Sequence, residues 1–302
     1  GSDMMKSMKV GTVLEAAFPG CQRRPDYYMK CLRRIADDPF YEAVELTYIS
    51  DPVLREEAGK VLKDSKMTTA YCAQPVILQN GLNLNSPVRE ERKRALLRMK
   101  ECIDEACGLG AGSLSFLAGT FAEDTVEEAM EYLAESAGEM CSYAKGRLQI
   151  EIELFDYDVE KRSLIGPSKR AVRLAEAVRK EQDNFWLLPD LSHIPQQHET
   201  IEEALHNLLP YMRRTHIGNC VMEKSSPLYG DCHPPFSYPG SCIGKEELSG
   251  YLGILAHTGF LNESDRPVVS FEIKPLSDAD IEDVLAENKE LLLQAMEMLK
   301  KE

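Results

Sequence analysis

The stretch LQIEIELF at residues 148–155 has the pattern of a buried β-strand that also carries ionisable side chains. Ile150, Ile152 and Leu154 alternate with Glu151 and Glu153, and residues two apart on a strand share a face. Both glutamates therefore face the same side of the predicted strand. An amphipathic stretch with helical spacing follows at 168–181, so this segment is typical of one strand followed by one helix.

The same strand-and-helix unit recurs along the chain. Seven further β-rich runs lie at about 8–14, 43–49, 67–73, 112–117, 185–191, 212–217 and 267–273. Charged stretches with helical spacing separate them, such as 87–107 and 125–144. Alternation of strands and helices favours a parallel sheet covered by helices, and eight units in 302 residues fit a closed barrel better than an open sheet. We predict the α/β class, as a (β/α)₈ TIM barrel.

Nothing in the sequence divides the chain, so residues 1–302 are predicted to form a single domain. The opening Gly-Ser pair resembles a cloning remnant, and we expect residues 1–7 to be a tag or a disordered start. The sequence leaves open whether the chain forms a homo-oligomer.

Composition excludes several classes of protein. With 43% hydrophobic and 28% charged residues, the chain is neither disordered nor fibrous. It has no apolar run of the roughly eighteen residues that a membrane span needs. The net charge of −15 disfavours nucleic acid as a partner, because phosphates are bound mainly by Lys and Arg. Nine cysteines without a C-x-x-C pair predict reduced thiols in a cytoplasmic protein.

Ionisable side chains gather where four consecutive strands should end. Glu153 closes strand five, Asp190 follows the apolar run of strand six, His216 lies at the end of strand seven, and Glu272 closes strand eight. In a barrel these strand ends converge on one half of the C-terminal face. Carboxylates brought together there repel one another unless a cation is present. Carboxylates with a histidine suit Mn²⁺, Zn²⁺ or Mg²⁺, so we predict a divalent metal site.

A long connection at 218–244 follows strand seven and should cover the same face of the barrel. It carries Asp231 and His233 in the sequence GDCHPP, and His193 comes three residues after Asp190. We expect Asp231 and His233 to lie within reach of His193. The three residues could hold a second metal ion or bind the hydroxyl groups of a substrate.

Three basic residues are candidates to contact a substrate. Lys274 follows Glu272 by two residues, and Lys161 lies in the connection after strand five. Arg214 precedes His216 by two residues, and it is also a candidate partner for Glu151 should that carboxylate be buried.

Five segments in the C-terminal half resemble the xylose isomerase-like TIM-barrel superfamily, in its branch of sugar phosphate isomerases and epimerases. They are IELFDYDVEKRSLIGP at 152–167, PDLSH at 189–193, THIGN at 215–219, YGDCHP at 229–234 and SFEIKP at 270–275. The N-terminal half matches mainly in the rhythm of its strands. The resemblance implies one divalent ion held by Glu153, Asp190, His216 and Glu272, with His193 as a substrate contact or a supporting residue.

The chain departs from the DNA-repair branch of that superfamily, which binds three zinc ions and needs further histidines on strands near 70 and 115. Those strands here are TTAYCAQP and SLSFLAG, without histidine. His193, Asp231 and His233 nevertheless keep the spacing of a separate zinc site in that branch, so a second ion stays an open alternative.

We therefore expect an isomerase or epimerase of a small sugar or sugar derivative that works through an enediolate. Glu153 and Glu272 would remove and return the proton, and His193 would hydrogen-bond the developing oxyanion. The first alternative is a metal-dependent dehydratase or lyase acting on a keto-polyol of the inosose type. Two others are an abasic-site DNA endonuclease and a non-enzymatic sugar-binding barrel.

Overall fold

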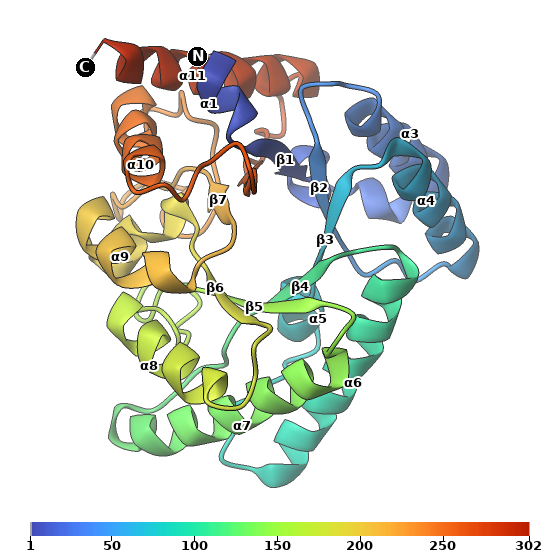
Figure 1. Cartoon of the computed structure of the whole chain (residues 1–302), viewed down its shortest axis with the longest axis vertical. Helices are drawn as coiled ribbons and strands as arrows, with labels where there is room; N and C mark the ends of the chain where they lie inside the picture. The colour runs from blue at the N-terminus through green and yellow to red at the C-terminus, as the bar shows by residue number, and fades with distance from the viewer. Residues whose placement is uncertain (1, 302) are drawn as a thin grey trace.

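Eight parallel strands form the inner layer of the molecule in the computed structural model, which describes residues 2–301 (Figure 1). Their hydrogen-bonded order is β6-β5-β4-β3-β2-β1-β8-β7. Single bridges between Leu187 and Met212 and between Asp190 and His216 join the two ends of this order. The strands are β1 (Lys9–Val13), β2 (Ala43–Thr47), β3 (Thr68–Cys72), β4 (Ser113–Phe116), β5 (Gln149–Glu153), β6 (Phe185–Leu188), β7 (Thr215–Ile217) and β8 (Val268–Phe271). The predicted (β/α)₈ barrel is confirmed.

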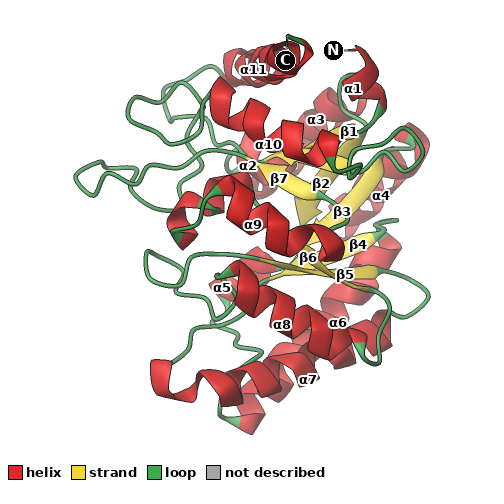
Figure 2. Ribbon diagram, turned by 60° about the vertical axis from the view of Figure 1, so that its left-hand side comes forward, coloured by secondary structure: helices red, strands yellow, loops and turns green. Residues whose placement is uncertain are grey.

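Helices cover the outside of these strands, as Figure 2 shows. They are α1 (Ser2–Lys6), α2 (Leu14–Ala17), α3 (Pro25–Ala36), α4 (Pro52–Ser65), α5 (Gln74–Gln79), α6 (Arg89–Gly108), α7 (Val126–Ala144), α8 (Ser168–Arg179), α9 (Ile201–Leu208), α10 (Lys245–His257) and α11 (Ile281–Lys300). The side chains of Asp51, Thr200 and Asp280 accept hydrogen bonds from first-turn amides and so define where α4, α9 and α11 begin.

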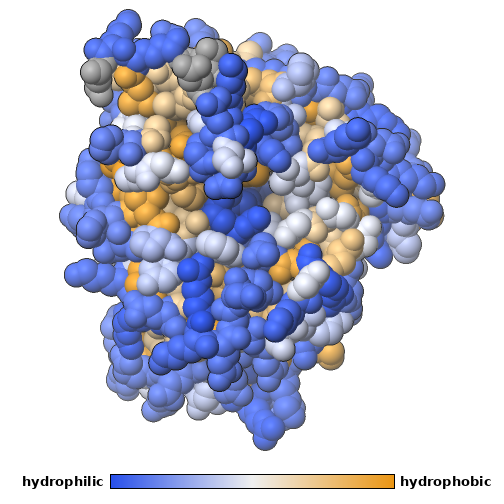
Figure 3. All heavy atoms as spheres, viewed as in Figure 1, coloured by the Kyte–Doolittle hydropathy of each residue, from blue (hydrophilic) through white to orange (hydrophobic). Residues whose placement is uncertain are grey.

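Most residues of the eight strands are buried, because helices cover the outer face of each strand and the inner face lies in the barrel interior. The face seen down the barrel is mostly hydrophilic (Figure 3). No helix within residues 2–301 is long and apolar enough to cross a bilayer.

We expected a tag or a disordered start over residues 1–7, and within the described residues Ser2–Lys6 forms the short helix α1. Arg266 donates hydrogen bonds to the backbone oxygens of Met5 and Lys6, and this ties the segment to the connection before β8.

Close packing of three strands depends on Gly11 in the middle of β1. Gly11 pairs with Ala43 of β2 and Ser270 of β8. A β-carbon there would lie 2.6 Å from Ser270 Oγ and 3.0 Å from the carbonyl oxygen of Ala43. The small side chains on both neighbours therefore leave no room for a methyl group at this position.

Gly11→Ala should lower the free energy of unfolding by about 1–3 kcal/mol, the usual cost of overpacking. Urea denaturation measures this change. The matched control is Gly138→Ala in α7, where an added β-carbon meets no atom of the described residues within 4 Å. That variant should gain about 0.5–1 kcal/mol, because alanine favours a helix. Changes of the same sign in both variants would contradict the packing argument.

Candidate metal centre

Four side chains from adjacent strand ends meet at the C-terminal mouth of the barrel. Glu153 is the last residue of β5, Asp190 follows β6, His216 lies in β7, and Glu272 follows β8. His216 Nδ1 is 3.4 Å from Glu153 Oε2, 3.6 Å from Asp190 Oδ2 and 3.4 Å from Glu272 Oε1. One ligand atom from each of the four lies within 4.8 Å of the others. The structure thus brings together the four residues expected to hold an ion.

The atoms that face one another in this cluster fit a divalent cation. Glu153 Oε2, Asp190 Oδ2 and His216 Nδ1 are buried and have no hydrogen-bond partner within residues 2–301. Buried polar atoms are normally paired, and carboxylates this close repel without a positive charge between them. Ligand atoms about 2.1 Å from an ion at tetrahedral angles lie roughly 3.4 Å apart, close to the 3.4–3.6 Å from His216 Nδ1 to an oxygen of each carboxylate. Carboxylate oxygens with an imidazole nitrogen suit Mn²⁺, Zn²⁺ or Mg²⁺.

The other oxygen of two ligand carboxylates is held by hydrogen bonds. Gln74 Nε2, at the start of α5, donates to Glu153 Oε1 at 2.8 Å. The backbone amide and hydroxyl of Ser192 donate to Asp190 Oδ1 at 2.8 and 2.6 Å, because Asp190 caps the short 3₁₀ helix Leu191–His193. Each carboxylate is therefore oriented with one oxygen toward the shared centre. Sequence reasoning missed Gln74, which nothing near 74 distinguishes as functional.

Below the cluster, a chain of buried ion pairs fills the barrel interior. Glu45 Oε1 on β2 accepts a hydrogen bond from His216 Nε2 at 2.8 Å, and Glu45 Oε2 pairs with Arg214 Nη1. Arg214 Nε lies 2.7 Å from Glu151 Oε1, and Arg213 Nη1 lies 3.0 Å from Glu151 Oε2. Burial alone would raise the pKa of Glu45, but Arg214 and His216 hold it well below its usual range.

These ion pairs correct one expectation and include a residue that sequence reasoning missed. We expected Arg214 to contact substrate, but its guanidinium lies between Glu45 and Glu151, since it is one side-chain layer deeper than His216. Its pairing with Glu151 agrees with the alternative reading of the sequence. Glu45 was missed, although a glutamate inside the apolar run AVELT at 43–47 was a signal that could have found it.

A cavity of about 300 Å³ opens over the cluster. Glu153, His216 and Glu272 form part of its wall. Its opposite wall comes from β1, β2, β3 and their following turns, with Val13, Glu15, Thr47, Cys72 and Pro75 among its residues. The remaining polar residues of the wall are Gln22, Gln74, Gln79, Lys161, Asp231, His233 and Lys274.

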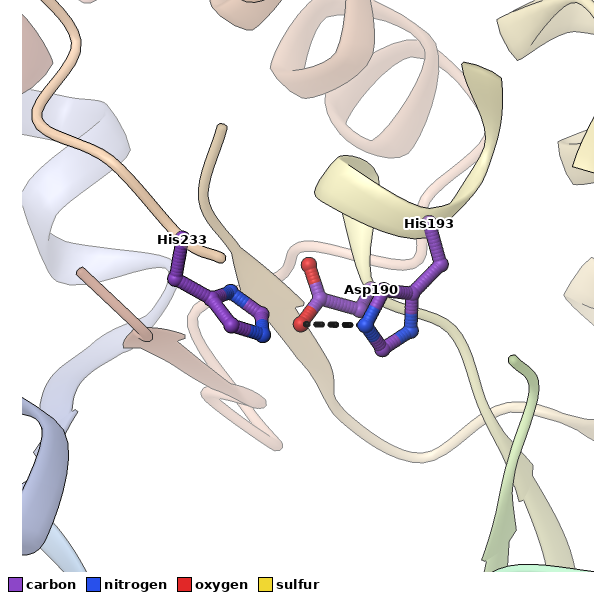
Figure 4. Close-up of side chains that lie close together, drawn as sticks. All are labelled: Asp190, His193 and His233. Carbon is purple, nitrogen blue, oxygen red and sulfur yellow. Dashed lines mark ion pairs between the residues drawn. The ribbon is translucent and has the colours of Figure 1, made fainter. Parts of the chain in front are cut away.

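Asp231 lies at the centre of a second cluster, which comes from the 218–244 connection and from the end of β6. Asp231 Oδ1 is 3.1 Å from His193 Nε2 and 2.8 Å from His233 Nε2, and Asp231 Oδ2 is 3.0 Å from Lys161 Nζ. Figure 4 shows His193 and His233 on either side of Asp190, whose Oδ2 is 3.9 Å from His193 Nε2. The connection therefore brings Asp231 and His233 to His193, as the sequence predicts.

Hydrogen bonds alone satisfy this second cluster, in contrast to the first. His193 Nδ1 lies 2.7 Å from the Leu154 carbonyl, so this nitrogen is the donor, and both oxygens of Asp231 have partners. The contacts of Asp231 need no ion, but one ligand atom each of Asp190, His193 and His233 lies within 4.8 Å of the others, so a second metal stays a prediction. Lys274 is exposed at the rim, and its backbone amide donates to the His233 carbonyl.

Charge sets the protonation of the two clusters. Burial would lower the pKa of His233, but Glu272 and Asp231 raise it to about 9. Asp190 and Asp231 likewise outweigh burial and raise the pKa of His193 well above its usual value. Across the cavity, burial raises the pKa of Glu15 to about 7, although the Thr47 amide donates to its Oε1. Sequence reasoning missed Glu15, which lies in a four-residue helix directly after β1.

The family described as xylose isomerase-like TIM barrel matches residues 11–302. Among solved structures, a D-tagatose 3-epimerase-like protein is 16% identical with a TM-score of 0.73, over 97% of this chain and 99% of that one. D-psicose 3-epimerase with D-tagatose from Clostridium cellulolyticum H10 is 15% identical with a TM-score of 0.66, over 97% and 99%. D-allulose 3-epimerase from Methylomonas sp. in complex with D-allulose is 14% identical with a TM-score of 0.67, over 97% and 96%. No curated protein sequence matches. At these identities the structures show a shared fold.

His216→Ala should lower the content of bound divalent metal, because it removes the only nitrogen among the four expected ligand atoms. Elemental analysis of the purified protein after dialysis against Mn²⁺ or Zn²⁺ measures this. His198→Ala is the control, since His198 pairs with Asp158 on the surface and should keep its full metal content. Undiminished metal in His216→Ala would remove His216 from the ligand set.

Glu15 should make stability fall as pH rises. Its pKa is 4.5 for an ordinary glutamate and about 7 in the folded chain, so the folded state holds a proton that the unfolded state has lost. The loss of stability accumulates between these two values and is constant above them. Glu15→Gln stays neutral and should therefore gain about 1–3 kcal/mol relative to the parent chain across this window.

Urea unfolding of the chelator-treated protein, repeated between pH about 5 and about 8, measures that difference. Glu57→Gln, which changes an exposed carboxylate in α4, is the control and should follow the parent chain at each pH. A difference between Glu15→Gln and the parent chain that does not change with pH would contradict the assignment.

Proposed function

Because the chain belongs to the xylose isomerase-like TIM barrel family, we propose that it is a divalent-metal-dependent isomerase or epimerase of a small sugar or sugar derivative. One observation carries the proposal. Glu153 Oε2, Asp190 Oδ2 and His216 Nδ1 are buried, have no hydrogen-bond partner in the described part of the chain and face one another. Glu153 and His216 also line a cavity that is open to small molecules. This arrangement is typical of a metal-dependent catalytic centre.

Glu153, Asp190, His216 and Glu272 would hold the ion. When bound, such an ion supplies Lewis acidity that polarises a substrate carbonyl and makes the neighbouring C–H more acidic.

Glu153 and Glu272 are the proposed acid and base. They come from β5 and β8, and each has an oxygen 3.4 Å from His216 Nδ1 on the cavity wall. Burial raises the pKa of Glu153, and Glu272 adds to this effect, whereas His216 opposes it. A raised pKa makes Glu153 a stronger base for a carbon-bound proton. Glu272 would then return a proton to the enediolate, at the neighbouring carbon or on the opposite face.

The second cluster would bind the polar groups of the substrate. His193 is held by the Leu154 carbonyl and by Asp231, and the cavity itself is lined by Asp231, His233 and Lys161. Protonated imidazoles and an ammonium group at fixed positions can stabilise developing negative charge on a substrate oxygen. Lys274 at the rim would meet the far end of the substrate.

The cavity favours a small substrate. About 300 Å³ is at the lower end of the range for small-molecule sites, which suits a free monosaccharide. Two of the similar structures contain D-tagatose and D-allulose, so free ketohexoses are the first compounds to test.

In heavy water the metal-loaded protein should incorporate deuterium at the carbon next to the carbonyl of a converted ketohexose, because the proton passes through an exchangeable carboxylate. Glu153→Gln and Glu272→Gln should each lower turnover by at least about a hundredfold. NMR of the sugar measures both the product and the deuterium.

The variants must be compared at equal, measured metal occupancy, because both glutamates are expected ligands. A metal-filled Glu272→Gln protein with near-normal turnover would refute the two-carboxylate mechanism. Conversion without deuterium incorporation would indicate a hydride shift between carbons. Loss of one water molecule from an inosose, with no conversion of ketohexoses, would identify a dehydratase instead.

A further inference from the structure

We propose that Glu45 is a positioning residue that fixes the ring of His216, so that Nε2 carries a proton directed into the barrel interior and Nδ1 faces the three carboxylates. This inference rests on the proposed function, since it concerns a histidine expected to bind metal. Glu45 is separate from the four expected ligands, which come from β5 to β8. It lies within β2, on the other side of the barrel from β6.

The contact between the two residues determines the direction of the hydrogen bond. Glu45 Oε1 lies 2.8 Å from His216 Nε2, within the range of a normal hydrogen bond. An ionised carboxylate can only accept, so Nε2 must be the donor. The opposite nitrogen, Nδ1, then lies 3.4–3.6 Å from Glu153, Asp190 and Glu272, where none of these distances is a normal hydrogen bond.

Glu45 can hold the ring because it is itself fixed. Its side chain is fully buried, and its second oxygen pairs with Arg214. Arg214 is anchored in turn by Glu151 at 2.7 Å. The Cys72 thiol also contacts Glu45 Oε1 at 3.6 Å. A rotation of the carboxylate would break the ion pair with Arg214 between two buried side chains, which is energetically costly.

This arrangement should matter for metal affinity. A carboxylate that accepts the far N–H of a metal-binding histidine fixes the ring orientation and increases the basicity of the ligand nitrogen, and its loss typically costs about 10–100-fold in affinity. With glutamine at position 45, the side-chain amide could donate to Nε2 and move the ring proton to Nδ1, where it would block the ion.

The experiment compares Glu45→Gln with Glu151→Gln. Both replace a buried carboxylate that pairs with Arg214, but only Glu45 touches His216. Zn²⁺ and Mn²⁺ dissociation constants are measured by competition with a chromogenic chelator, and thermal unfolding confirms that both variants are folded. We expect Glu45→Gln to weaken binding by about 10–100-fold and Glu151→Gln by less than about threefold. Equal effects in both variants would overturn the proposal, since they would show a general effect of lost buried charge.

A second measurement needs no variant at Glu45. In protein labelled with ¹⁵N-histidine, NMR should show a proton on His216 Nε2 both without metal and with Zn²⁺ bound, the signals being assigned by their loss in His216→Asn. An unprotonated Nε2 in either state would overturn the proposal. Failure of the parent chain to bind any divalent ion would count against the proposed function, whereas the Nε2 signal of the metal-free protein would still decide the role of Glu45.

Discussion

Arg214 inside the barrel is the constraint on which the candidate site depends. Its guanidinium pairs with Glu45 on one side and Glu151 on the other, and all three side chains are buried. Breaking such a pair from one side leaves an uncompensated charge and typically costs about 3–5 kcal/mol. The three residues therefore hold β2, β5 and the segment before β7 in one register. His216 stands directly above them, so the position of a candidate ligand is fixed by ion pairs in the layer below.

The site divides into a rigid part and a part carried by a connection. The four expected ligands lie in strands or within two residues of a strand end, where the barrel fixes the backbone. Asp231 and His233 belong to the long connection after β7. The contacts of Asp231 with His193, His233 and Lys161 hold this connection at the C-terminal mouth of the barrel. Ligands on strands give the accurate geometry that a metal centre needs, so the part of the site expected to hold an ion is the part that the barrel fixes.

The sequence predicts those site residues that are marked by their position at the end of an apolar strand. Asp190 and Glu272 each follow an apolar run, and parallel strands in a barrel end on one face, so their convergence follows from the fold. Glu45, Gln74 and Glu15 could not be found in the same way. Glu45 meets His216 across the barrel from 171 positions away, and no pattern within β2 states which residue it faces. We expected Arg214 to contact substrate at the mouth of the barrel, but it lies deeper, between Glu45 and Glu151. The reason is that period-two alternation predicts the face of a strand on which a residue lies and not its depth along the barrel axis.

The two glutamates of β5 differ in their depth along the barrel axis, although the alternating pattern places both on the same face. Glu151 and Glu153 face the same interior and are both buried. Glu151 has Arg213 and Arg214 as partners, so its charge is balanced within the chain, and its role is structural. Glu153 lies one layer nearer the mouth, where Gln74 holds one oxygen and the other faces Asp190, His216 and Glu272 without a hydrogen bond. A folded chain bears the energetic cost of such an atom when a ligand from solution supplies the missing charge. The two carboxylates therefore differ in their positive partner, which Arg213 and Arg214 supply for Glu151 and which we propose a bound ion supplies for Glu153.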